Sequence, residues 1–186
     1  MKKNQTQFII YAGILTALTV IGAFIKIPFP LAPLTLQTLF TLLAGCILPP
    51  RYAALSQAAY LLLGLAGLPV FTLGGGIGYI FQPTFGFLLS LPFAAFFISV
   101  LNRKFNKQRS FISFAWINMA AATGILFFGS LWLFVAVNTF VGKPVSIEDA
   151  VLSGMVIFLP GETAKSFVVS YLAGQFFDRY PDFNIS

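Results

Sequence analysis

Long apolar runs separated by short polar gaps are the feature that most constrains this chain. Of its 186 residues, 58% are hydrophobic and 9% are charged, whereas a soluble domain carries roughly 25% charged residues. A bilayer is the solvent that suits so apolar a chain, and a span needs about 20 apolar residues, so there is room for six or seven helices. The pattern predicts an all-α integral membrane protein with a single domain over residues 1–186.

Prolines and clustered charges divide the chain into six predicted transmembrane helices. Pro28 and Pro30 end the first helix, and Pro49 and Pro50 separate the second from the third, because proline cannot continue a helix. The predicted spans are 8–25, 35–48, 52–67, 84–101, 111–137 and 160–177.

The final apolar run, from about Ala150 to Phe177, has two interpretations. It is either one long helix kinked at Pro160, or a short surface or re-entrant segment over 147–159 followed by a span that begins at Pro160. Proline suits the first turn of a helix, and the acid Glu162 suits the positive end of the helix dipole. We therefore favour the second interpretation.

The basic residues predict the orientation of the helices. With six spans, both termini and the second and fourth gaps share one side, which carries Lys2, Lys3, Arg51, Arg103, Lys104, Lys107, Arg109 and Arg179. The other side carries Lys26 and Lys143, so the positive-inside rule places both termini in the cytoplasm. The net charge of +6 therefore reflects membrane topology, and no nucleic-acid partner is predicted.

The residue types present exclude several kinds of chemistry. The chain has no histidine, which excludes histidine-based metal sites and triads. Its one cysteine, Cys46, lies in an apolar stretch and is predicted to be a buried apolar residue. Neither a phosphate-binding loop with its lysine nor a Gly-x-Ser-x-Gly elbow is present. We expect no cofactor and no enzyme, and an intramembrane enzyme that uses Glu162 as a base is a weak alternative.

A charge pair in the last apolar run is the first candidate site. Glu162 and Lys165 are three residues apart and share one face of a helix. An ammonium inside a bilayer costs about 2.5–3.5 kcal/mol and marks a functional position, so Lys165 is predicted to pair with an anionic ligand. The structural alternative is an interfacial pair that reaches to water.

Two loops on the same outer side supply further candidates. The glycine-rich segment 74–78, which includes Gly75, lets the backbone approach a ligand closely. After it come Tyr79 and Phe85 as candidate aromatic walls, and Gln82 and Thr84 as candidate polar contacts. An interfacial turn is the alternative interpretation. In the proline-rich first loop, Thr35 and Gln37 offer polar groups, and the loop is equally a lid or a plain connector.

Polar and small residues inside the spans predict helix contacts. Five polar side chains inside the spans are expected mostly to bond between helices: Gln57, Asn118, Thr123, Ser130 and Asn138. Asn138, at the outer end of the fifth span, is a candidate ligand contact. A stripe of small side chains on the first span permits close approach by another helix, internal or from a partner: Ala12, Gly13, Thr16 and Ala17.

Together these motifs resemble the BioY family, the biotin-specific substrate-binding subunits (S components) of energy-coupling-factor (ECF) transporters. The most specific piece is the segment 60–71 with the glycines and residues 83–87 that follow it. The segments 35–39 and 160–165 are similar to the loop-and-helix and Pro-Gly-acid-x-x-Lys patterns of the family. Two positions differ, since Glu162 stands where aspartate is more common and Phe85 where a glycine is common.

The resemblance implies a bacterial, multi-pass membrane protein that captures biotin near the outer face. It also implies a transmembrane coupling protein and two cytoplasmic ATPases as partners, and it assigns the small stripe on the first span to the coupling protein. In this hypothesis Lys165 binds the biotin carboxylate, Thr35, Gln37 and Gln82 bind its ureido group, and Tyr79 and Phe85 cover its rings. An S component for another small anionic vitamin is the alternative.

Overall fold

The structure, a computed structural model, describes residues 3–29, 32–106, 108–142, 144–180 and 183. Pro30, Lys2, Lys107 and Lys143 therefore lie outside the described residues. The six predicted helices are confirmed as α1 (Lys3–Phe24), α2 (Gln37–Ile47), α3 (Pro50–Leu65), α4 (Phe85–Phe105), α5 (Phe111–Ala136) and α7 (Leu159–Arg179).

Short elements connect these helices at one end of the bundle. Strand β1 (Lys26–Ile27) pairs antiparallel with β2 (Leu34–Thr35), which places Lys26 opposite Thr35. The other connecting elements are the 3₁₀ helix η1 (Ile77–Phe81), the π-helical segments η2 (Val137–Val141) and η3 (Leu152–Val156), and the five-residue helix α6 (Ile147–Val151).

The final apolar run contains three helical elements in succession, namely α6, η3 and α7. Two turn residues follow η3, and α7 then begins at Leu159 with Pro160 in its first turn. At that position the missing proline N–H costs no helical hydrogen bond. Helix α7 thus starts one residue before the position predicted for the last span, and the surface or re-entrant character of 147–159 stays a prediction.

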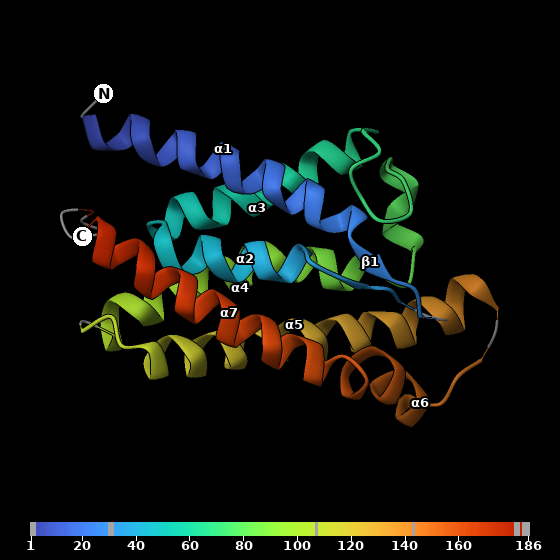
Figure 1. Cartoon of the computed structure of the whole chain (residues 1–186). Helices are drawn as coiled ribbons and strands as arrows, with labels where there is room; N and C mark the ends of the chain where they lie inside the picture. Colours follow the sequence, from blue (N-terminus) through green and yellow to red (C-terminus); the bar gives the residue numbers. More distant parts are fainter. Residues whose placement is uncertain (1–2, 30–31, 107, 143, 181–182, 184–186) are drawn as a thin grey trace.

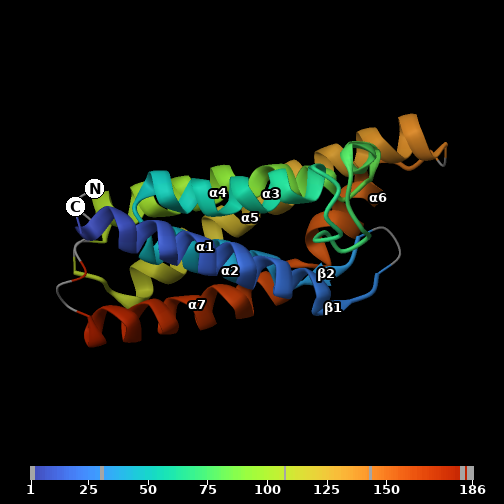
Figure 2. The same ribbon diagram turned by 90° about the horizontal axis from the view of Figure 1, so that it is seen from above.

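The helices alternate in direction along the bundle (Figures 1 and 2). Helix α1 begins and α7 ends at the same end of the molecule (Figure 1). That end also holds the α2–α3 and α4–α5 connections, and with them Arg51, Arg103 and Lys104. The β1–β2 hairpin, the 66–84 loop and α6 gather at the opposite end, which we call the loop end.

Four helical segments are long and apolar enough to cross a bilayer: Gln5–Phe24, Phe85–Phe105, Phe111–Val141 and Ile147–Arg179. Helices α2 and α3 have 11 and 16 residues. At 1.5 Å per residue α2 rises only about 16 Å, roughly half of the hydrocarbon core. Such a short helix fits inside the protein, where its neighbours rather than lipid surround it.

Helix α2 lies at the centre of the bundle and contacts α1, α3, α4, α5 and α7. Leu42, Ala44 and Cys46 on it are all buried, as the sequence predicts for the cysteine. Close packing against α4 depends on Gly45, because a Cβ there would lie 2.6 Å from the Cβ of Ile98.

Buried hydrogen bonds connect the helices inside the bundle. The Gln57 amide receives a hydrogen bond from Thr41 at 2.9 Å and donates to Thr19 at 3.2 Å, which joins α1, α2 and α3. Asn118 donates to Ser170 at 3.2 Å and so joins α5 to α7. Both helix-to-helix predictions are confirmed.

Thr123 and Ser130 behave differently from that prediction. Their hydroxyls donate to backbone carbonyls within α5, at Met119 and Leu126 respectively. The prediction of helix-to-helix bonds was wrong for these two residues. A threonine or serine hydroxyl in a helix can donate to the backbone carbonyl oxygen four residues earlier, so it needs no partner on another helix.

The small stripe on α1 divides between two faces. Ala12 and Thr16 are buried, and the Thr16 hydroxyl is 2.8 Å from the Ser56 carbonyl oxygen of α3. Gly13 and Ala17 are exposed, and an added Cβ on Gly13 would meet nothing within 4 Å. Half of the stripe therefore packs the bundle internally, and the other half faces outward.

We expect Gly45→Ala to lower the free energy of unfolding by about 1–3 kcal/mol, the usual effect of overpacking a close contact. Its Cβ would also lie 3.0 Å from the carbonyl oxygen of Ala95, which is backbone and cannot rotate away. Thermal unfolding of the detergent-purified protein measures the change. Gly174→Ala is the matched control, since its Cβ meets nothing within 4 Å while helix propensity rises equally. Equal melting temperatures for the two variants would contradict the packing role of Gly45.

Candidate functional site

The first loop folds back on the end of α1 before α2 begins. The Leu36 N–H donates to the carbonyl oxygens of Gly22 at 3.0 Å and Ile25 at 3.2 Å. Gly22 permits this approach, because a Cβ there would lie 2.9 Å from the Leu36 backbone. The β1–β2 hairpin thus delivers Thr35 and Gln37 to the interior of the loop end.

The 66–84 loop is held in place by aromatic packing and backbone bonds. The ring of Phe71 packs against Gly64, where an added Cβ would lie 2.0 Å from the ring, and the Gly76 N–H donates to the Gly64 carbonyl oxygen at 2.7 Å. The Lys26 ammonium donates to the Thr72 carbonyl oxygen at 3.0 Å. The hairpin and the glycine-rich loop are therefore in direct contact.

The charge pair of α7 is buried and joins three parts of the chain. The Lys165 ammonium donates to the Thr35 carbonyl oxygen at 2.9 Å, to the Thr38 hydroxyl, and to Glu162 Oε1. The Thr38 hydroxyl in turn donates to the same carboxylate oxygen at 2.9 Å. An ammonium has three donors, so Lys165 is fully satisfied by α7, α2 and the end of β2.

The second carboxylate oxygen of this pair is different. Glu162 is 2% exposed, and its Oε2 has no hydrogen-bond partner among the residues that the structure describes. An unmade hydrogen bond to a buried charged oxygen costs several kcal/mol. Glu162 Oε2 is therefore a buried acceptor whose hydrogen-bonding capacity is unused by the described residues.

A second polar network lies beside the charge pair. The Thr35 hydroxyl donates to Gln37 Oε1 at 2.8 Å, and Gln37 Nε2 donates to the Tyr60 hydroxyl. Tyr60 donates onward to the Val70 carbonyl oxygen at 3.1 Å. This chain of bonds connects the first loop through α2 and α3 to the 66–84 loop, and it supplies the partner that a polar residue in an apolar helix requires.

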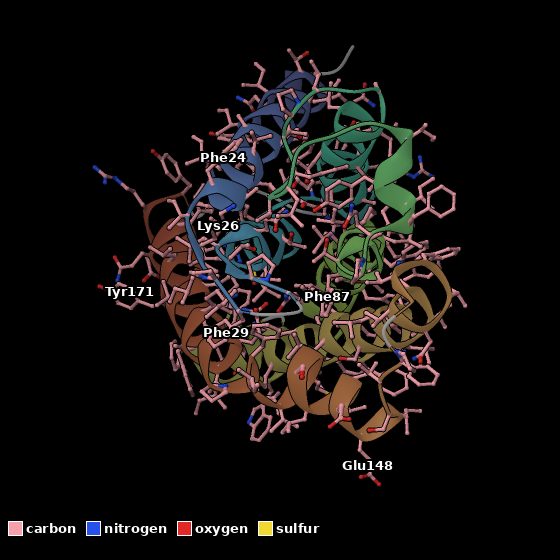
Figure 3. All side chains as sticks on the ribbon, turned by 90° about the vertical axis from the view of Figure 1, so that its right-hand side faces the viewer. Phe24, Lys26, Phe29, Phe87, Glu148 and Tyr171 are labelled. Carbon is pink, nitrogen blue, oxygen red and sulfur yellow. The ribbon has the colours of Figure 1, made fainter. Side chains whose placement is uncertain are left out.

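These groups surround a small cavity of about 60 Å³ at the loop end. Its polar lining is Thr35, Gln37, Thr38, Thr72, Thr84 and Glu162, and its apolar lining is Ala32, Pro33, Leu34, Tyr79, Phe87, Leu88, Leu91, Ile125, Leu126 and Phe158. Viewed from the loop end, Phe87 lies near the centre of the ring of helices, whereas Tyr171 and Glu148 project from its outside (Figure 3).

Tyr79 and Thr84 form a part of the cavity wall that is both aromatic and hydroxyl-bearing. The Tyr79 hydroxyl lies 3.1 Å from the Thr84 hydroxyl, and burial raises the pKa of Tyr79. The phenol therefore stays neutral and keeps its proton to donate. At about 60 Å³ the cavity is smaller than a typical small-molecule pocket of about 300–1,000 Å³.

The sequence-predicted site residues divide into those at the cavity and those away from it. Thr35, Gln37, Tyr79 and Glu162 line the cavity, and Lys165 lies directly behind Glu162. Three features predicted from separate loops thus meet at one place.

Four other predicted site residues have structural contacts away from the cavity lining. The Gln82 side chain is exposed and its carbonyl oxygen accepts from the Trp132 indole at 3.1 Å, while Phe85 packs edge-on against Trp132. A Cβ on Gly75 would lie 2.1 Å from the Leu68 carbonyl oxygen. Asn138 accepts from the Val145 N–H at 3.2 Å and closes the connection after α5.

Sequence reasoning did not select several lining residues. Thr38 sits beside the chosen Gln37, and its polarity at the start of an apolar helix was the available signal. Thr84, which was predicted together with Gln82 as a polar group, does line the cavity. Phe87 and Phe158 are apolar residues in apolar surroundings, so no local pattern distinguishes them from lipid-facing phenylalanines. Within the described residues, no group of three or more His, Cys, Asp or Glu side chains is arranged to hold a metal ion.

Comparison with known proteins shows which family the chain belongs to. A model of the BioY family matches residues 1–182. The chain belongs to the BioY family. The predicted resemblance is thereby confirmed, and with it a multi-pass membrane protein of a transporter family rather than an enzyme.

Individual BioY relatives resemble the chain over most of its length. It is 38% identical over 161 residues to a probable biotin transporter BioY of Lysinibacillus sphaericus, covering 84% of this chain and 79% of the relative. It is 37% identical over 166 residues to the biotin transporter BioY of Thermotoga maritima, covering 89% and 92%. The fold matches the crystal structure of the S-component for biotin from an ECF-type ABC transporter with a TM-score of 0.82 and 26% identity, over 96% and 95% of the two chains.

We expect Tyr60→Phe to destabilise this BioY protein by about 1–3 kcal/mol, because Gln37 Nε2 and the Val70 carbonyl oxygen both lose their partner. Thermal unfolding measures the loss, and limited proteolysis within 66–84 should become faster. Tyr171→Phe, which removes an exposed hydroxyl from α7, is the control. The network has no role in holding the loop if both variants are cleaved at the same rate.

Proposed function

We propose that this chain is the biotin-binding S component of an ECF-type transporter, which captures biotin at the outer face of the membrane for uptake driven by partner subunits. The observation that carries the proposal is the cavity at the loop end, where an unpartnered carboxylate oxygen, an amide and four threonines converge between aromatic walls. The names of the BioY relatives and of the matching crystal structure point to the same ligand.

The hydrogen-bonding inventory suggests which part of biotin each group binds. Biotin carries two ureido N–H donors, a ureido carbonyl, an apolar bicycle and a carboxylate tail. Glu162 Oε2 is the buried acceptor without a donor, so we assign it to a ureido N–H. The hydroxyls at the cavity suit the ureido carbonyl, and the rings of Tyr79 and Phe87 suit the bicycle.

In this arrangement Lys165 acts through Glu162. Its three donors are already used by Thr35, Thr38 and Glu162, so it neutralises the carboxylate and fixes its orientation. The biotin carboxylate then points toward the hairpin and the solvent. The alternative remains the hypothesis from the sequence, in which Lys165 leaves these partners and pairs with the biotin carboxylate.

The family also suggests the partners. We propose a transmembrane coupling protein and two cytoplasmic ATPase subunits, with this chain itself binding the vitamin. Gly13 and Ala17 are the members of the small stripe that face outward on α1, and they are the positions that we assign to the coupling protein.

Calorimetric titration of the detergent-purified protein with biotin tests the function. We expect tight binding of biotin, and we expect Glu162→Gln to weaken it by about tenfold or more, since a hydrogen bond to a charged group contributes roughly 1.5–3 kcal/mol. Glu148→Gln, an exposed glutamate at the same end of the bundle, is the matched control and should bind like the unmodified protein. A folded protein that binds no biotin would refute the proposed function.

Biotin amide, which lacks the carboxylate charge, separates the two ligand orientations. If Glu162 holds the ureido group, biotin and biotin amide bind the unmodified protein with similar affinity. If Lys165 holds the carboxylate, the amide binds much more weakly, and Glu162→Gln/Lys165→Met removes the difference. The double variant leaves no unpaired buried charge, so its stability allows the comparison.

A further inference from the structure

A second hollow lies away from the proposed biotin cavity, between α4 and α5. This α4–α5 groove has a volume of about 710 Å³. Its lining includes Phe93, Phe97 and Leu101 of α4 and Ala120, Gly124 and Phe128 of α5. Ile125 borders both the groove and the biotin cavity, so one buried side chain separates them.

Small side chains on α5 make the groove, and they are not needed for packing the two helices. A Cβ added to Gly124 would meet nothing within 4 Å. By contrast, a Cβ on Gly129 or Gly86 would lie 2.1 Å from the Phe87 ring or 2.2 Å from Trp132, so those two glycines admit a neighbour from inside the protein. Gly124 therefore opens toward the outside of the bundle.

The lining of the groove matches a hydrocarbon chain. Ser90 is its polar member apart from the Trp132 indole, and both are already bonded, to the carbonyl oxygens of Phe87 and Gln82. Both helices belong to candidate membrane-spanning segments, where a hollow that opens to the outside of the bundle borders lipid. From Gly86 to Leu101 the groove follows α4 for about 22 Å at 1.5 Å per residue, longer than the roughly 15 Å of one leaflet.

A positive charge lies one helical turn beyond the last α4 residue of the groove. Lys104 follows Leu101 by three residues and so continues the same face of α4 beyond the groove. Its side chain is exposed and lies over the ring of Phe105, with no carboxylate partner in the part of the chain that the structure describes. Basic residues at the cytoplasmic end of a span attract anionic headgroups.

We propose that the α4–α5 groove binds an anionic phospholipid of the cytoplasmic leaflet, with one acyl chain along Phe97 and Gly124 and the phosphate beside Lys104. The apolar shape of the groove suits the acyl chain of the lipid, and Lys104 favours a negatively charged headgroup. This site is independent of biotin binding, because Ile125 closes the groove from the cavity.

Tryptophan fluorescence in lipid nanodiscs tests the site. In a Trp116→Phe/Trp132→Phe background, Phe97→Trp places a reporter in the groove. Tyr171→Trp places a control reporter on the outside of α7, and both positions lie eight residues before the end of their helix. The quenchers are phosphatidylglycerol and phosphatidylcholine with brominated acyl chains, titrated into unbrominated phosphatidylcholine.

We expect the groove reporter to be quenched by brominated phosphatidylglycerol with about fivefold preference over phosphatidylcholine, and to reach saturation at low mole fraction. The control reporter should show no preference. Lys104→Gln should remove the preference for phosphatidylglycerol. Arg179 is an exposed cation at the end of α7, and Arg179→Gln should leave the preference unchanged.

Gly124→Leu should abolish saturable quenching by filling the groove, and Gly174→Leu, which also meets nothing within 4 Å, should leave it intact. Identical titrations for the two reporters would overturn the proposal and mean ordinary boundary lipid. Protection of the groove reporter from both quenchers would also overturn it, and would indicate that a second copy or another protein helix covers the groove.

Discussion

The buried pair of Lys165 and Glu162 is the interaction on which the loop end depends. In a chain with 9% charged residues, a charge inside the bundle has few partners, and an unpaired one costs several kcal/mol. The ammonium satisfies its three donors by drawing the end of β2 and the start of α2 onto α7. One carboxylate oxygen is bonded in this way, and the other has no hydrogen-bond partner among the described residues, in a side chain that lines the cavity. The ion pair therefore holds β2, α2 and α7 together and places a charged side chain in the lining of the cavity.

The short helix α2 makes room for this arrangement. With 11 residues it occupies about half of the bilayer thickness, so the space above its first turn is available to the hairpin, the 66–84 loop and the cavity. A helix of full length in this central position would fill that space. The same shortness is tolerated because α2 is surrounded by other helices. Its polar side chains Gln37 and Thr41 donate to Tyr60 and Gln57 of α3.

Much of the candidate site was predictable because its strongest members break a local rule. Glu162 and Lys165 are charges in an apolar run, and Gln37 is an amide at the start of one. Each needs a partner, so each marks a tertiary contact. Phe87 and Phe158 break no rule, and nothing near them in the chain distinguishes a cavity wall from a lipid-facing surface. Gln82 and Asn138 were chosen for their polarity, but their hydrogen bonds join neighbouring segments instead.

The sequence by itself determined that the chain lies in a bilayer, how many helices it has and which end of the bundle carries the basic residues. Hydropathy, prolines and the distribution of lysine and arginine are properties of short stretches of chain, so they can be read without the tertiary structure. It also determined the start of the last helix at the Pro-Gly-acid element. Only the tertiary structure decided which oxygen of Glu162 is free, which half of the small stripe on α1 faces outward, and where α4 and α5 leave a groove. These properties depend on the relative rotation and spacing of helices distant in sequence, and no local pattern specifies them.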